Sequence, residues 1–245
     1  MSSTVIIIPT RLQAKRLPNK PLKIINEKEM ILHVYDLAVK SGVGEVLVAT
    51  PDKTISELIK KNGGKSFLSQ EPHETGTDRV FEAFTKVFSN NPEIIINLQG
   101  DMPIINPNDI KKVNQPLMQG FDIGTLVTDL QKTQLENLNI TKAEINWIKK
   151  YYIGKAENFY KSSKISEKEK YHHVGIYSFR YETLKKFVSL PPSKNEKKYG
   201  LEQLRALEAD MTIGVTYVKD VPISVDTKDD LLNVEQIIKE ENNEN

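Results

Sequence analysis

Short apolar runs alternate with segments of helical spacing along the first hundred residues of the chain. Three mainly apolar runs have the length of buried strands, and they cover residues 5–8, 46–49 and 94–98. Between these runs, apolar side chains recur every three or four residues, which predicts helices around residues 30–38, 55–59 and 80–88. The alternation predicts an α/β fold with a mainly parallel mixed sheet flanked by helices. Ligands of such sheets bind at the carboxyl ends of the strands.

The segment from about residue 129 to residue 171 has a different pattern. It is rich in Lys, Asn and Tyr, and its hydrophobic periodicity is weak. Two stretches within it, residues 145–152 and 157–161, could pair as a hairpin. We therefore expect a small hairpin lobe that projects from the sheet.

Alternation resumes after this segment. We expect strands at residues 173–179 and 213–218, and helices near residues 181–188, 199–209 and 229–238. No linker is long enough to divide the chain. The expectation is a single domain over residues 1–245, with the small lobe at about 129–171.

Composition excludes several classes of protein. The net charge of +1 gives no reason to expect a nucleic-acid or anionic-membrane partner, and the absence of cysteine excludes disulfides and thiolate metal sites. No apolar run approaches the roughly 20 residues that a membrane-spanning helix needs. The N-terminus lacks the basic and apolar segments of a secretory signal. We therefore expect a soluble, cytoplasmic protein.

A basic segment directly follows the first predicted strand, so it should lie at the carboxyl edge of the sheet. Residues 9–22 contain Arg11, Lys15, Arg16 and Lys20, in a chain where only five of 34 basic residues are arginine. Such a cluster suits a triphosphate, because a guanidinium group can grip phosphate oxygens at two points. The segment is not a Walker A loop. On charge alone, a solvated basic loop is the simpler interpretation.

Three further segments carry residue types that suit nucleotide chemistry. Thr75 or Thr77 could cap the helix that follows and leave N–H groups free for an anion or a base edge. Asp101 follows the third strand on a glycine-containing turn, and Asp226 ends an extended apolar stretch. Both carboxylates would suit Mg²⁺, which prefers oxygen ligands. Each segment also has a simpler interpretation as an ordinary cap or turn.

The last third adds polar candidates. His172 and His173 are adjacent in a predicted strand, so they point to opposite faces, which argues against a shared metal. Glu202 and Gln203 interrupt a mostly apolar helical stripe and could form hydrogen bonds with a ligand.

Taken together and in order, six segments resemble the CMP-Kdo synthetases, the 3-deoxy-manno-octulosonate cytidylyltransferases of lipopolysaccharide assembly. They are RLQAKRLPNKPL at residues 11–22, TGTDR at 75–79, LQGDMP at 98–103, HVGIYSFR at 173–180, LEQLRALE at 201–208 and SVDTKDDL at 224–231. The resemblance implies a nucleotide-diphospho-sugar-transferase-like fold, a homodimer, Mg²⁺ as cofactor, and CTP and an acidic 2-keto sugar as substrates. The implied reaction transfers CMP from CTP to 3-deoxy-manno-octulosonate (Kdo) and releases pyrophosphate.

The resemblance also implies roles for individual residues. The implied catalytic residues are Arg11, Lys20, Asp101 and Asp226, and the last two would hold the metal. The implied nucleotide-binding residues are Thr10, Arg11, Arg16, Lys20, Thr75, Gly76, Gln99 and Asp101. The implied sugar-binding residues are Arg79, Gln99, His173, Tyr177, Glu202 and Gln203.

Three positions depart from the family pattern. Met102 and Tyr199 stand where glutamate is common, and Ser162 stands where the family has an arginine that supports the sugar-binding lobe. Lys161 and Lys164 are the candidates to replace that arginine, but a lysine acts only as a point charge. Another 2-keto sugar acid of the amino-Kdo, sialic or pseudaminic type therefore stays open as the substrate. A related glycosyltransferase and a non-catalytic nucleotide-binding homologue are the competing classes.

Overall fold

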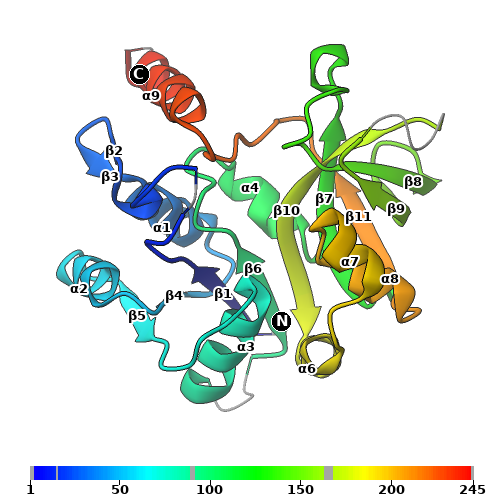
Figure 1. Ribbon diagram of the computed structural model, residues 1–245, viewed down its shortest axis with the longest axis horizontal. Coiled ribbons are helices and arrows are strands. Elements are labelled where there is room, and N and C mark those ends of the chain that lie inside the picture. The colour runs from blue at the N-terminus through cyan, green and yellow to red at the C-terminus, as the bar shows by residue number, and fades with distance from the viewer. Residues whose placement is uncertain (1–2, 15, 89–91, 163–167, 244–245) are drawn as a thin grey trace. The chain divides into compact units, whose positions relative to one another are not determined.

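The computed structural model describes residues 3–14, 16–88, 92–162 and 168–243 (Figure 1). The chain forms two compact units, a first unit of Met1–Lys111 with Pro222–Asn245 and a second unit of Lys112–Val221. The lobe expected at about residues 129–171 falls within the second unit. The expected single domain stays a prediction.

Parallel strands form the sheet of the first unit in the order β5-β4-β1-β6. Their bounds are Thr4–Pro9 for β1, Glu45–Thr50 for β4, Lys65–Leu68 for β5 and Ile94–Leu98 for β6. The central strand β1 pairs with β4 on one side and β6 on the other, so its apolar run is fully buried. The three predicted strands of this region are confirmed. Strand β5 was not predicted, because it is a short, half-exposed edge strand with little apolar signal.

Helices of the first unit pack against this sheet, as the alternation predicts: α1 lies on β4, and α3 lies on β1 (Figure 1). The helix bounds are Met30–Ser41 for α1, Lys53–Lys61 for α2, Gly76–Val87 for α3 and Lys228–Asn243 for α9. The shorter elements are η1 (Lys20–Leu22), β2 (Ile24–Ile25), β3 (Lys28–Glu29) and α4 (Pro107–Lys112), the last of which runs to the boundary of the unit.

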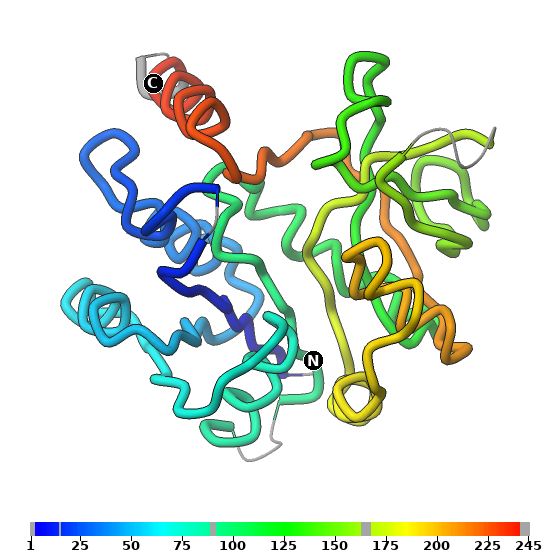
Figure 2. Tube along the Cα trace, in the orientation of Figure 1, coloured from blue at the N-terminus to red at the C-terminus, as the bar shows by residue number. Residues whose placement is uncertain are grey.

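The strands of the second unit pair in the order β10-β7-β11-β9-β8, and β8 pairs again with β10, so the pairings close a ring. Their bounds are Ile123–Asp129 for β7, Lys142–Lys149 for β8, Ile153–Tyr160 for β9, Tyr171–Arg180 for β10 and Ile213–Tyr217 for β11. Only β7 and β11 run parallel among these pairs. Figure 2 traces this path from green through yellow to orange.

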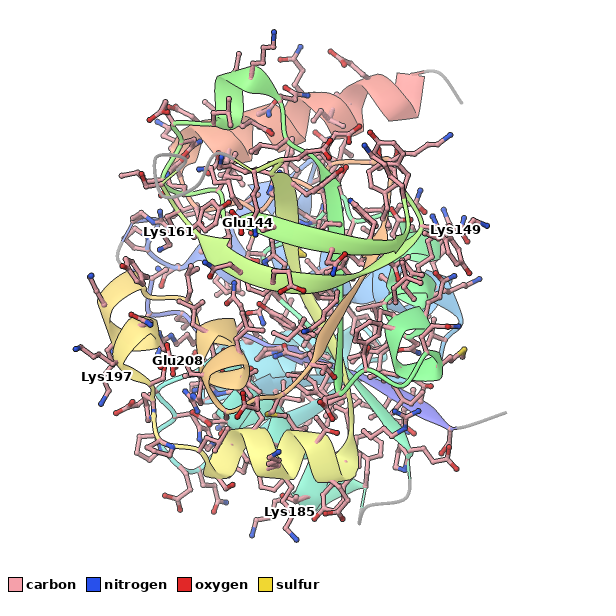
Figure 3. All side chains as sticks on the ribbon, turned by 90° about the vertical axis from the view of Figure 1, so that its right-hand side faces the viewer. Glu144, Lys149, Lys161, Lys185, Lys197 and Glu208 are labelled. Carbon is pink, nitrogen blue, oxygen red and sulfur yellow. The ribbon has the colours of Figure 1, made fainter. Side chains whose placement is uncertain are left out.

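Strands β8 and β9 form a hairpin, as predicted for this segment, but with Ile145 paired to Ala156 both strands begin earlier than the expected stretches 145–152 and 157–161. The hairpin turns at residues 150–152, where Tyr151 has a φ of 56°, a left-handed conformation suited to a tight turn. Lys149 marks the end of β8 in Figure 3.

One expected helix of the second unit begins later than predicted. The helix expected near residues 199–209 corresponds to α8, which begins at Gln203, and α7, which ends at Tyr199, was not expected. Gly200 lies between them with a φ of 63°, a left-handed cap that stops the first helix. The helices of this unit are α5 (Gln115–Met118), η2 (Lys132–Gln134), α6 (Tyr181–Ser189), α7 (Lys194–Tyr199) and α8 (Gln203–Glu208).

A buried ion pair joins these helices. The Arg205 guanidinium donates two hydrogen bonds to the Glu196 carboxylate, with Nε–Oε2 and Nη2–Oε1 distances of 2.8 and 2.6 Å. It also stacks over the Phe187 ring of α6. This arginine therefore serves the packing of α6, α7 and α8.

None of the helices among the described residues has the length and apolar character to cross a bilayer.

Candidate active site

A pocket of about 460 Å³ lies in the first unit, where β1 and β6 end. Every site residue that was predicted in this part of the chain lines it: Thr10, Arg11, Arg16, Lys20, Thr75, Gly76, Arg79, Gln99, Asp101 and Asp226. The sequence segments that were expected to meet at the carboxyl edge of the sheet therefore do so. Lys15, which was counted in the basic segment, lies outside the described residues.

The basic segment after β1 is fixed by backbone hydrogen bonds and by one apolar anchor. Asn19 N donates to Leu12 O at 3.3 Å and closes the segment, and Leu12 N donates to Asp52 Oδ2 at 2.8 Å. Leu17 is buried in a cluster with Val225. This apolar contact brings the basic segment and the residue before Asp226 together, although they are far apart in sequence.

The two aspartates meet through the backbone and through one lysine. Val225 N donates to Asp101 O at 2.9 Å, which holds the segment of Asp226 beside the turn that follows β6. Lys20 Nζ lies 2.8 Å from Asp101 Oδ2 and 3.1 Å from Asp226 Oδ1. Arg16 Nη2 contacts the second oxygen of Asp226 at 2.8 Å. These ion pairs form a chain that runs from Arg16 through Asp226 and Lys20 to Asp101.

Electrostatics at Lys20 reflect these partners. Burial favours the neutral amine, but the adjacent carboxylates outweigh this cost and raise the pKa of Lys20 above its ordinary value of 10.5. The ammonium group is therefore charged at neutral pH. Asp101 Oδ1 is buried and has no hydrogen-bond partner among the described residues.

Arg79 adds a buried positive charge to the pocket. Its side chain is 5% exposed, and its Nε has no hydrogen-bond partner in the described part of the chain. Burial lowers the pKa of Arg79, and the charge of Arg11 lowers it further, although a guanidinium stays protonated at neutral pH. Two neighbouring guanidinium groups with a free donor are suited to an anion.

The remaining wall is built by α3 and the end of β6. Thr75 Oγ1 accepts from Asp78 N at 3.2 Å and caps α3, as predicted. Gln99 is oriented by a relay in which its Nε2 donates to Asn97 Oδ1 and Asn97 Nδ2 donates to Thr77 Oγ1, at 2.9 and 3.1 Å. A Cβ at Gly100 would lie 3.1–3.2 Å from atoms of Thr10 and Pro9, so a larger residue there would require these neighbours to shift by a few tenths of an ångström.

The other predicted sugar-binding residues lie in the second unit. His173 is buried on β10, and its Nε2 lies 3.0 Å from Thr125 Oγ1. Thr125 Oγ1 lies 2.7 Å from Ile176 O and donates there, so it accepts from a neutral His173. Burial, together with the neighbouring His172, lowers the pKa of His173 to about 3, which agrees with a neutral ring.

The Tyr177 ring contacts the His173 ring at a tilt of 44°, with ring centroids 5.5 Å apart. Burial, followed by the charge of Glu202, raises the pKa of Tyr177, so its hydroxyl keeps its proton at neutral pH. Glu202 and Gln203 begin α8, and Gln203 is buried. Their sugar-binding roles stay predictions.

Comparisons with known proteins decide the family. The cytidylyltransferase family profile matches residues 5–213. The chain belongs to the cytidylyltransferases. The 3-deoxy-manno-octulosonate cytidylyltransferase of Nitrobacter winogradskyi is 40% identical to it, over 96% of this chain and 94% of that protein. The enzyme of the same name from Paramagnetospirillum magneticum is 38% identical, over 96% of this chain and 97% of that protein.

Solved structures agree with this assignment. A CMP:2-keto-3-deoxy-manno-octonic acid synthetase complexed with CTP has a TM-score of 0.88 and 35% identity, and covers 98% of this chain and 100% of its own. A cytidylyltransferase from Leptospira borgpetersenii, at 16% identity and a TM-score of 0.61, supports the fold. The resemblance inferred from the six segments is therefore confirmed.

The departures from the family pattern have distinct surroundings in this cytidylyltransferase. Met102 is buried and Tyr199 is exposed at the end of α7. Ser162 follows β9 and is partly exposed, while Lys164 lies outside the described residues. The Lys161 carbonyl next to Ser162 accepts a hydrogen bond from the fully buried Lys142, with an Nζ–O distance of 2.6 Å.

Sequence reasoning missed two supporting residues of the cytidylyltransferase pocket, Asn97 and Asp52, and gave Thr77 only as a candidate helix cap. Asn97 and Thr77 orient Gln99, and Asp52 holds the backbone of the basic segment. Asn97 did give a signal, because it is a polar residue inside an otherwise apolar strand. Asp52 gave none, since an aspartate before a helix is an ordinary cap.

Proposed function

We propose that this cytidylyltransferase transfers CMP from CTP to 3-deoxy-manno-octulosonate, giving CMP-Kdo and pyrophosphate for lipopolysaccharide biosynthesis. The observation that carries the proposal is the meeting of Arg11, Arg16, Lys20, Asp101 and Asp226 in one pocket of the first unit. The relatives that bear this enzyme name cover nearly the whole chain at 38–40% identity, which supports the same reaction.

The cations of the pocket are suited to the triphosphate. Arg11 and Arg16 present planar forks that can bind phosphate oxygens at two points, and Lys20 supplies a compact charge. Phosphoryl and nucleotidyl transfer gain most of their rate from positioning and from neutralising charge, which such groups provide. We assign Thr10, Thr75, Gly76 and Gln99 to the nucleoside side of the same pocket.

A divalent metal fits the two aspartates. Asp101 Oδ1 is buried and has no hydrogen-bond partner among the described residues. The Asp226 carboxylate contacts the same lysine, Lys20, as Asp101 does, and both aspartates line the pocket with oxygen donors. Among the described residues, no group of three or more His, Cys, Asp or Glu side chains could hold a metal alone. We therefore propose that Asp101 and Asp226 hold Mg²⁺ together with phosphate oxygens and water. When bound, it would neutralise developing phosphate charge and help the sugar hydroxyl to ionise.

The proposed reaction is an in-line attack of the sugar's C2 oxygen on the α-phosphorus of CTP. The new P–O bond forms as the bond to the β-phosphate oxygen breaks, and pyrophosphate leaves with that electron pair. Arg11 and Lys20 would hold the departing phosphates. We assign Arg79 and Gln99, and from the second unit His173, Tyr177, Glu202 and Gln203, to the sugar acid.

The sugar is the finer part of the proposal, because Ser162 replaces the family arginine. A cytidylyltransferase for another 2-keto sugar acid is the alternative. Mass spectrometry of products from CTP, Mg²⁺ and a panel of such acids separates the two. CMP-Kdo as the main product supports the proposal, and a different CMP-sugar supports the alternative. A folded protein that binds CTP but releases no pyrophosphate with any of these acids contradicts both.

We also propose that the enzyme is a homodimer, as the family resemblance implies, and that it is cytoplasmic, as expected from the sequence. Sedimentation at micromolar concentration tests the dimer, and a monomer at that concentration would contradict it.

A further inference from the structure

Lys20 occupies the position between the two carboxylates that a bound cation would need. Its ammonium group donates to Asp101 Oδ2 and Asp226 Oδ1 at 2.8 and 3.1 Å. An ammonium group has three donor hydrogens and no acceptor, so these two contacts use most of its capacity. The chain therefore already supplies positive charge to the pair of aspartates, from Lys20 to both of them and from Arg16 to Asp226 alone.

A divalent cation bound by the same carboxylates would lie close to this ammonium group. The two positive charges would repel each other, and the lysine would also compete for the same oxygen lone pairs. Lys20 can move to new partners, because its flexible four-carbon stem is not tied to a rigid fork. The triphosphate of CTP would provide such partners in the same pocket.

We propose that Lys20 is an internal counter-ion that weakens divalent-metal binding until nucleotide phosphates draw it away from Asp101 and Asp226. This inference rests on the proposed function for the identity of the metal and the nucleotide. It adds a coupling between them: binding of CTP releases the carboxylates, and binding of the metal frees Lys20 for the phosphates. By linkage, each ligand strengthens the other by the same factor.

The first experiment measures Mn²⁺ binding in the absence of nucleotide, by electron paramagnetic resonance of the free ion. Lys20→Met keeps the length of the stem and removes the charge. We expect it to bind one Mn²⁺ at least about tenfold more tightly than the wild type, since a competing charge is gone. The matched control is Lys40→Met, which removes an exposed lysine of α1 and changes the net charge equally. It should leave Mn²⁺ binding unchanged.

A double variant tests whether the tighter Mn²⁺ binding of Lys20→Met occurs at the two aspartates. Lys20→Met combined with Asp101→Asn should lose the tighter Mn²⁺ binding, because a ligand is removed as well. If Lys20→Met folds poorly by circular dichroism, Lys20→Gln provides the same test with a polar neutral side chain. Mn²⁺ binding that is equal to or weaker than wild type in a folded, neutral Lys20 variant overturns the proposal.

The second experiment measures the coupling from the side of the nucleotide. Calorimetric titration of CTP with and without Mg²⁺ gives the factor by which the metal strengthens CTP binding. This factor should be smaller in Lys20→Met than in the wild type, and an equal factor would overturn the proposal. Neither experiment contains the sugar. An enzyme inactive with every sugar acid would therefore leave this inference standing, while an active enzyme without the effect would remove it alone.

Discussion

Lys20 and Lys142 both hold an ammonium group away from bulk water, but they differ in the acceptors that surround it. Lys20, in the first unit, faces two carboxylates, whereas Lys142, in the second, donates to the carbonyl oxygens of Asn137 and Lys161 at 2.5 and 2.6 Å. The carboxylates raise the pKa of Lys20 despite its burial, and burial lowers the pKa of Lys142.

The contrast separates an exchangeable charge from a fixed one. Carboxylates that hold a lysine can hold another cation instead, so the Lys20 site can take part in a reaction. The carbonyls around Lys142 precede β8 and follow β9, so this lysine joins the two open ends of the hairpin. Under the proposed function, Lys20 therefore serves ligand binding, whereas Lys142 serves the fold.

The largest expected effect comes from removing the partners of Lys20. Asp101→Asn and Asp226→Asn should each lower turnover by about 10²–10³-fold, on the scale of losing one electrostatic contact in an active site. The double variant should lose much less than the product of the two losses, because both residues serve one assembly. Pyrophosphate release across a Mg²⁺ titration gives these values.

The control for the aspartates is Asp36→Asn, since Asp36 is exposed on α1 and lies outside the pocket. It should retain wild-type turnover. Strictly multiplicative losses for Asp101 and Asp226, or full activity in either single variant, would show that they do not share a metal.

Arg11 tests whether the pocket needs the planar guanidinium of an arginine or only the positive charge that a lysine would also supply. Arg11→Ala should lower kcat/KM for CTP by about 10–100-fold, as expected when a charged hydrogen-bonding group is lost. Arg11→Lys should recover only part of this, because one prong of the guanidinium is missing. Steady-state kinetics decide the matter, with Lys40→Ala as a control. Full activity in Arg11→Lys would mean that the fork is not used.

Lys142 should reveal itself through the pH dependence of stability. Its pKa is lowered in the folded state, so the unfolded chain binds more protons in the pH range below the ordinary value of 10.5. The penalty for burying the charge is therefore present at low pH and is relieved as the pH rises toward 10.5. The free energy of unfolding of the wild type should rise with pH relative to that of Lys142→Met.

Urea unfolding of both proteins between pH 7.5 and 10 measures this difference. Lys168→Met, which removes a largely exposed lysine of the same unit, is the control and should show no such trend. A difference that stays constant with pH would show that Lys142 carries no burial penalty.

His173 should make the protein sensitive to acid. Its folded pKa of about 3 lies below the ordinary 6.5, so unfolding takes up a proton between these values and stability falls as the pH falls. One such proton corresponds to about 1.4 kcal/mol per pH unit near pH 5. In His173→Gln this part of the slope should be absent. Equal acid slopes in the two proteins would place His173 in a solvated, charged state.

Three of the four strands of the first unit could be predicted from the sequence, because short, mainly apolar runs between helical segments indicate buried parallel strands. The sequence predicted the second unit less well: neither β7 nor α7 was expected, and α8 begins at Gln203 rather than near residue 199. The ring of strands depends on pairings between distant segments, which local periodicity cannot specify.

The pocket shows the same limit. Residues such as Arg11 and Asp101 follow strands directly, so their place at the carboxyl edge could be predicted. The contact of Lys20 with both aspartates could not, because it depends on Leu17 and Val225 sharing one apolar cluster. His73 and Glu82, which contact each other before and within the helix that Thr75 caps, were also missed.

His73 and Glu82 form a smaller polar cluster. Like Lys142 it holds a segment of the fold, and like Lys20 it concerns the pocket. Glu82 Oε2 lies 2.7 Å from His73 Nε2 and also accepts from Ser69, so it ties both ends of the segment between β5 and Thr75 to α3. Burial alone would raise the pKa of Glu82, but the hydrogen bonds from Ser69 and His73 outweigh it and lower the pKa. Because Thr75 lines the pocket, loss of this tie should loosen one wall of the nucleotide site.

The smallest expected effect is therefore that of Glu82→Gln, which keeps the shape of the side chain and removes its charge. KM for CTP should rise by about two- to fivefold, the value of one weakened hydrogen bond, while kcat stays close to wild type. Glu57→Gln is the control, because Glu57 is exposed on α2 and should change neither parameter. A fall in kcat with KM unchanged would mean that Glu82 supports the chemistry itself. No change in either parameter would mean that Thr75 keeps its place without this tie.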